Sequence, residues 1–170
     1  MAVGTAAWKV GYTADTSGRE LARTILRGHL SDADSIAIHE HITLSYLWVL
    51  GAYEFIRTLC DRVSVDDLEK TPAEVREILL EVKRRFARVR MPLAKMEAAS
   101  KHEDEDGPIA YPGMRHGVGV AWKLNANTLV PRRELSDALL ESLERRRSVF
   151  LNYQAKHLGE NSAPVLLPRG

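Results

Sequence analysis

The distribution of hydrophobic residues predicts one long helix from about residue 32 to residue 62. The run from Ile42 to Leu59 is apolar around almost the whole circumference of a helix. Ser31 is a suitable cap, because its hydroxyl can accept a hydrogen bond from a free amide at the helix start. At 1.5 Å per residue such a helix would be about 45 Å long. Since it has no natural water-facing side, we expect it to be central and enclosed by the rest of the chain or by a second copy.

A second helix begins with the clearest local signal in the chain. Thr71, Pro72 and Glu74 form a capping box with proline at the first helical position. The residues that follow keep the i, i+3, i+4, i+7 spacing of one buried stripe: Val75, Ile78, Leu79, Val82, Phe86 and Val89. We expect this helix to end near Arg90, because Pro92 disfavours helical geometry at the residue before it.

The other segments are predicted from weaker patterns. We expect an N-terminal arm over residues 1–18, a short amphipathic helix over 19–30 and a C-terminal tail over 160–170. Residues 100–116 are polar and rich in turn formers, which predicts a loop. Alternating apolar residues predict a small β-hairpin near 117–130.

A last helix is predicted to begin between Pro131 and Ser136 and to reach about Leu158, where Gly159 is a fitting stop. The predicted fold class is therefore mainly α. We expect an antiparallel bundle of four major helices, with the hairpin at one end, in a single domain over residues 1–170.

Composition narrows the classes of function. Hydrophobic residues at 45% and charged residues at 28% are typical of a folded, soluble protein. A net charge of +1 gives no overall field that would attract nucleic acid or a membrane surface. The single Cys60 cannot form an internal disulfide, and the N-terminus lacks the pattern of a signal peptide. We therefore expect a cytoplasmic protein that does not span a membrane.

Glu54 and Arg57 are the first candidates for chemistry, because they lie one turn apart in the apolar helix. The simple interpretation is an intrahelical salt bridge. If the pair is buried, a carboxylate held by a cation in a sheltered groove could instead serve as a catalytic base.

A basic segment near the end of the second predicted helix is the candidate anion or RNA site. It contains Arg84, Arg88, Arg90 and Lys95, which could bind phosphate from one flank of the helix. Cations near a helix C-terminus are also explained by the helix dipole alone. The acidic run at residues 103–106 could fold over this segment as a lid.

The sequence predicts neither a metal site nor a cofactor. His39 and His41 flank Glu40, but residues two apart on a helix point to opposite sides and cannot grip one ion. The acidic run also lacks the alternating ligands and glycine of a calcium loop.

Two main hypotheses about function remain open, beside a small-molecule binder that would need a pocket in the bundle core, and whether the protein is an enzyme is not decided. The leading one is a non-enzymatic, homo-oligomeric or partner-binding protein, with Tyr46 and Trp48 at the interface. The alternative is a HEPN-like RNA-binding domain or metal-independent ribonuclease. Arg23 and His29 have a spacing similar to the Arg and His motif of HEPN domains. That spacing is frequent by chance in an arginine-rich chain, so it assigns no family.

Overall fold

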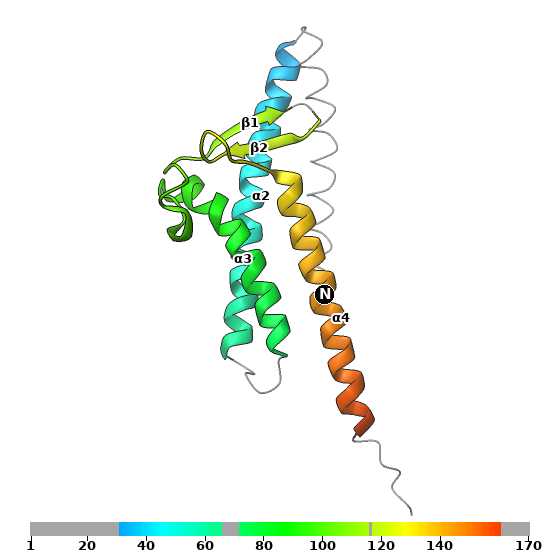
Figure 1. Cartoon of the computed structure of the whole chain (residues 1–170). Coiled ribbons are helices and arrows are strands. Elements are labelled where there is room, and N and C mark those ends of the chain that lie inside the picture. Colours follow the sequence, from blue (N-terminus) through cyan, green and yellow to red (C-terminus); the bar gives the residue numbers. More distant parts are fainter. Residues whose placement is uncertain (1–30, 66–71, 116, 161–170) are drawn as a thin grey trace, which may run out of the picture.

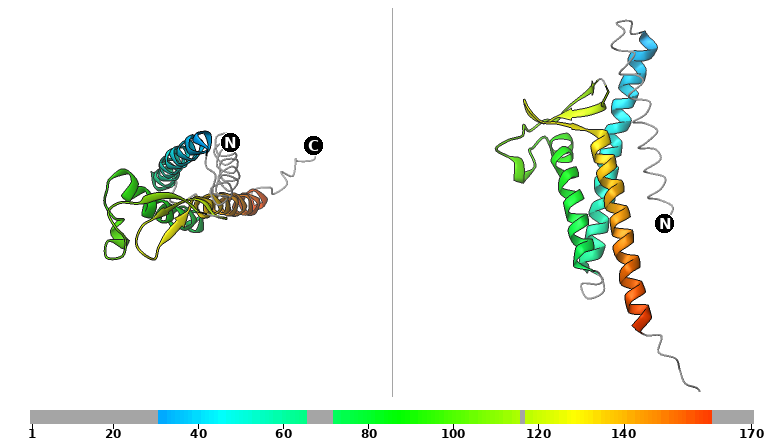
Figure 2. Two further views of the ribbon diagram at one scale, coloured as in Figure 1. Left: turned by 90° about the horizontal axis from the view of Figure 1, so that it is seen from above. Right: turned by 45° about the vertical axis from the view of Figure 1, so that its right-hand side comes forward.

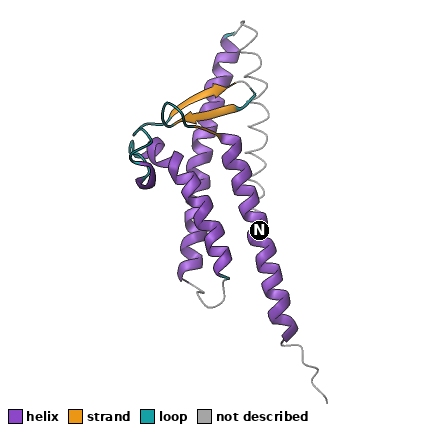
Figure 3. Ribbon diagram, viewed as in Figure 1, coloured by secondary structure: helices purple, strands orange, loops and turns teal. Residues whose placement is uncertain are grey.

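Three long helices and a small antiparallel sheet form the part of the chain that the structure describes (Figures 1 and 3). The structure is a computed structural model, and it describes residues 31–65, 72–115 and 117–160. The elements in chain order are α2 (Asp32–Val65), α3 (Ala73–Ala94), the single turn η1 (Ser100–His102), β1 (Tyr111–Arg115), β2 (Gly119–Lys123), β3 (Leu129–Pro131) and α4 (Arg132–Glu160).

The helices alternate in direction: α2 and α4 run one way and α3 runs the other way (Figures 1 and 2). Among the three described helices, α3 lies against both α2 and α4. The central position predicted for α2 is therefore not confirmed within the described residues. The N-terminal end of α2 and the C-terminal half of α4 project from opposite ends of the molecule (Figure 1).

The bundle of four major helices is not confirmed, because the described residues hold three. The predicted helix over residues 19–30 lies outside the described residues, as do the arm over 1–18 and nearly all of the tail over 160–170. The long helix predicted from the apolar run is present, and so is the last helix, which continues to Glu160.

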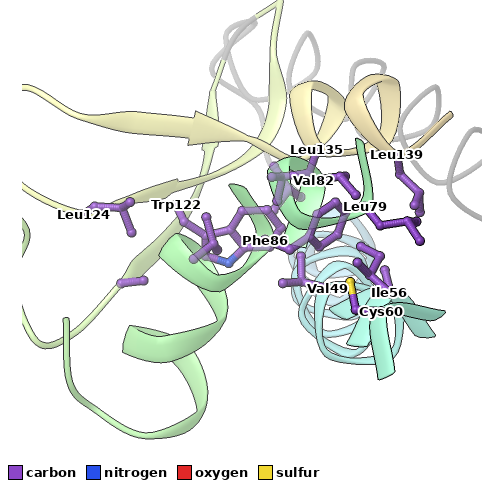
Figure 4. Close-up of a cluster of buried hydrophobic side chains, with 14 of the residues drawn as sticks. Val49, Ile56, Cys60, Leu79, Val82, Phe86, Trp122, Leu124, Leu135 and Leu139 are labelled. Carbon is purple, nitrogen blue, oxygen red and sulfur yellow. The ribbon is translucent and has the colours of Figure 1, made fainter. Parts of the chain in front are cut away.

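The core forms where α2, α3, α4 and β2 meet (Figure 4). Every residue of the stripe predicted on α3 is buried. Phe86 and Trp122 are fully buried members of the same core cluster, and the ring of Trp48 is 5.6 Å from that of Phe86. Val49 and Ile56 bring one side of α2 into the same cluster. The buried stripe could be predicted because most other positions on α3 are polar, so only one face of the helix was suited to the core.

Both ends of α3 differ from the prediction. Pro72 is the N-cap residue, without a side-chain cap, and Thr71 lies outside the described residues. The helix does not break before Pro92 but continues to Ala94. Proline in the last turn removes only one backbone hydrogen bond, and the Pro92 ring is fully buried. Its packing in the core therefore offsets the lost bond.

A three-stranded antiparallel sheet replaces the isolated hairpin that we predicted. The strand order is β1-β2-β3, with Trp122 of β2 opposite both Pro112 and Val130. β1 falls in the segment predicted to be a loop. Pro112 and Gly113 are weak strand formers, and proline is tolerated at a sheet edge, so β1 depends on its pairing with β2.

Candidate functional site

The first half of α2 carries an exposed apolar surface, which we call the α2 row: Ile36, Thr43, Leu44, Leu47 and Gly51. At 100° per residue these positions fall within about 100° of the helix circumference. Ile36 is 61% exposed, and Leu44 and Leu47 are each 55% exposed. Large aliphatic side chains that are more than half exposed on one face are candidates for a contact with another molecule.

The α2 row is exposed because it lies opposite the packed side of the helix. Val49, Ala52 and Ile56 face the core, and only that side of α2 is covered by α3 and the sheet. We had expected the rest of the chain or a second copy to enclose this helix. The described part of the chain covers only one side of it. An open hollow of about 640 Å³ lies beside the start of the row, against Ile36, His39, Glu40, Thr43 and Leu44.

Tyr46 and Trp48, the predicted interface residues, lie at the edge of this surface and are partly buried. Trp48 packs on Phe86, and the guanidinium carbon of Arg132 lies 4.6 Å from the centre of the Trp48 ring. Arg132 is itself only 1% exposed. Trp48 thus takes part in contacts within its own chain, and its role at an interface stays a prediction. Ile36, Leu44 and Leu47 on the same helix are more exposed than Trp48.

Glu54 and Arg57 form the expected ion pair, but they are not buried. Arg57 Nε donates to Glu54 Oε2 at 2.7 Å, and Arg57 Nη1 donates to Asp61 Oδ2 at 3.0 Å. The side chains of Glu54 and Arg57 are 47% and 48% exposed. The hydrogen bond to Glu54 and the charges of Glu54 and Asp61 raise the pKa of Arg57. The question of burial that the sequence left open is thus answered for the described chain, in which the pair lies on the uncovered side of α2. Their proposed catalytic role therefore loses the low-dielectric setting on which it depended.

Asp106 is the centre of a tight polar contact that we call the Arg88 clamp: Arg88, Asp106 and Asn125. Arg88 Nε and Nη2 donate to the two carboxylate oxygens of Asp106 at 2.7 and 2.9 Å. Asn125 Nδ2 donates to Asp106 at 2.9 Å, and the Asp106 side chain is fully buried. The hydrogen bond from Arg88 lowers the pKa of Asp106 and raises that of Arg88, although burial opposes both changes. The clamp joins α3 to the acidic loop and to the turn after β2.

Two of the other predicted anion-binding residues also lie close to a carboxylate. Arg90 lies 3.5 Å from Glu54 and 5.0 Å from the centre of the Tyr53 ring, and Lys95 lies 3.4 Å from Glu97. Arg84 is exposed. Three of the four cations therefore already have a carboxylate partner. The expected lid is observed in part, since Asp106 of the acidic run binds Arg88; a role for the four residues in anion binding stays a prediction.

The histidines of the first half of α2 do not converge. His39 is exposed and its Nδ1 lies 2.7 Å from the carbonyl oxygen of Ser35, whereas His41 is 7% exposed. Across residues 31–65, 72–115 and 117–160, no three His, Cys, Asp or Glu side chains are grouped so that they could bind a metal ion.

The helices of the described segments include none with the length and apolar character needed to cross a membrane. Comparison with known proteins adds no family: the chain matches no protein-family model, no curated protein and no solved structure.

Proposed function

We propose that this protein is not an enzyme and works by assembling with a protein partner through the α2 row. The observation that carries this proposal is the exposure of Ile36, Leu44 and Leu47 on one face of one helix. Fully burying such a side chain contributes about 1.5–3 kcal/mol. Since each is slightly more than half exposed, a partner would gain roughly 1 kcal/mol or more from each of them.

The face that carries the row is not purely apolar. At 100° per residue the exposed Glu40 falls inside the arc of the row, between Ile36 and Leu44, so a partner would also have to accommodate this carboxylate. Trp48 and Phe86 pack beneath the helix on its other side, and this packing supports the row on a rigid element. The packing beneath the helix and the exposed aliphatic side chains support assembly with a protein partner.

Site-specific photocrosslinking tests the proposal directly. A photoreactive amino acid replaces Leu47 in the full chain, and covalent adducts are sought after irradiation of the expressing cells. The matched control carries the same residue at Leu151 of α4, which is 52% exposed and therefore as accessible as Leu47 at 55%. We expect a discrete protein adduct from position 47 and none from position 151. No adduct at position 47, or equal adducts at both positions, contradicts the proposal.

The alternative function, a HEPN-like RNA-binding domain or ribonuclease, has less support. It requires a free cationic flank, whereas Arg88, Arg90 and Lys95 are each paired with a carboxylate. It predicts RNA binding that weakens steeply with salt and is lost when Arg84 is replaced by alanine. Filter binding at low salt tests it, and the absence of retained RNA excludes it.

A further inference from the structure

We propose that the partner seated on the α2 row is a basic amphipathic helix of another protein, which places a lysine or an arginine against Glu40. This inference rests on the proposed function and specifies the chemistry of the partner. It follows from the position of Glu40 within the row and from the charge of the surrounding stretch of α2.

Glu40 lies in the middle of the surface that a partner would cover. Successive residues of a helix are turned by about 100°, so Glu40 is about 40° from Ile36 and about 40° from Leu44 around the helix axis. Glu40 is exposed, and it lines the open hollow of about 640 Å³ beside the start of the row. A partner that covers the apolar side chains of the row therefore also covers this carboxylate.

Glu40 has no cation of its own chain beside it. The residues one turn away on α2 are uncharged: Ile36, Ala37, Thr43 and Leu44. None of the ion pairs formed within residues 31–65, 72–115 and 117–160 includes Glu40. Covering an unpaired carboxylate is costly, and a cation from the partner offsets that cost. The partner therefore has to bring the counter-charge.

The charge of the surrounding stretch favours a cation over a neutral hydrogen-bond donor. Residues 32–56 contain no lysine or arginine, and they contain these carboxylates: Asp32, Asp34, Glu40 and Glu54. Glu54 is already paired with Arg57, so the net negative charge lies in the first half of α2. Such a surface attracts a basic partner and disfavours an acidic one. The same stretch of a second copy supplies carboxylates and no cation, so it does not fit this surface.

The shape of the row favours a helix as the bound element. From Ile36 to Gly51 the row is about 22 Å long, and an amphipathic helix has an apolar stripe of similar width. A Cβ atom added at Gly51 would meet no heavy atom within 4 Å, so this end of the row is open to close approach. The other end lies where α2 projects from the molecule (Figures 1 and 2). A partner helix can thus set apolar residues on Leu44 and Leu47 and one basic residue on Glu40.

Two neutral substitutions of Glu40 test this inference in the full chain that carries the photoreactive residue at position 47. Glu40→Gln keeps the shape of the side chain, and Glu40→Leu extends the apolar row. Each leaves a partner cation unpaired, so we expect the yield of the adduct to fall, by about tenfold for Glu40→Leu. A partner without a cation would instead bind both variants at least as well, because no carboxylate has to be covered. Glu144→Leu on α4 is the matched control, since Glu144 is also exposed and lies outside the row.

Mass spectrometry of the adduct provides a second readout. The cross-linked segment of the partner should have the sequence of an amphipathic helix, with a lysine or an arginine within one turn of the cross-linked residue. An unchanged or higher yield from both Glu40 variants, a segment without a cation, or an adduct to a second copy of this chain refutes the inference. In those three cases the adduct still forms, so the proposed function stands. The absence of any adduct from position 47 with Glu40 unchanged removes both.

Discussion

Replacing Asp106 with alanine should remove a buried polar contact that stabilises this fold. The Asp106 carboxylate is fully buried and accepts three hydrogen bonds, two from Arg88 and one from Asn125. Alanine abolishes all three and leaves the Arg88 guanidinium, which is 25% exposed, without its strongest partner. The clamp also joins segments 18 and 19 residues apart, so its loss should loosen the acidic loop.

The expected loss follows from the burial of the pair. Removing one partner of a buried ion pair costs about 3–5 kcal/mol, because the remaining charge is left uncompensated. Water can reach part of Arg88, so we expect the lower end of this range, about 3 kcal/mol. Glu105 provides the matched control: it lies 3.5 Å from the same guanidinium but is 66% exposed. Replacing Glu105 with alanine should change the free energy of unfolding by no more than about 0.5 kcal/mol.

Urea unfolding at neutral pH, followed by tryptophan fluorescence, measures both effects. Trp122 is fully buried in the native state, so its emission should shift when the core opens. The double variant with Arg88→Ala and Asp106→Ala then gives the coupling energy of the pair. A loss for Asp106→Ala no larger than that for Glu105→Ala would refute the assignment of the clamp as a stabilising contact.

Three further predictions follow from individual residues. The hydrogen bond from Arg88 lowers the pKa of Asp106 in the folded state. The ionised carboxylate therefore stabilises the fold fully above the pKa of an unfolded aspartate, about 3.9, and this stabilisation is lost as the pH falls through the lower folded value. The free energy of unfolding of Asp106→Asn in urea should depend less on pH in acid, because the amide does not titrate there. Met96 has φ 55°, so Met96→Gly should raise the free energy of unfolding by about 0.5–1 kcal/mol in thermal unfolding, whereas Met96→Ala, which keeps the Cβ atom, should not. Burial raises the pKa of the Cys60 thiol, so a thiol reagent should react far more slowly with the native protein than with the urea-unfolded chain, and equal rates would contradict this burial.

The sequence was most informative where polar and apolar positions contrasted. On α3 the residues from Val75 to Val89 form one apolar stripe on an otherwise polar helix, so the inner face could be predicted. On α2 the apolar residues surround the helix, and no inner face could be chosen. Packing of Val49 and Ile56 against α3 made that choice and left Leu44 and Leu47 exposed. The sequence showed that α2 has an excess of apolar residues. It could not show which of them would form the exposed α2 row.

Contacts between distant residues were the other limit. Glu54 and Arg57 pair as their local spacing predicts, but their exposure depends on which side of α2 is covered. Arg88 was recognised as part of a basic segment and Asp106 as part of an acidic run, with no indication that these two would meet at 2.7 Å. β1 was missed for the same reason, because its strand state comes from the pairing with β2.

The amino-acid sequence by itself determined the three long helices of the described residues, the apolar stripe of α3 and the surplus of apolar residues on α2, since each follows from interactions within a few turns of one segment. Only the tertiary structure decided which side of α2 is buried, which carboxylate holds Arg88 and which strands pair. Those outcomes depend on how several segments share a limited buried volume, and the spacing of residues along one segment does not contain that information.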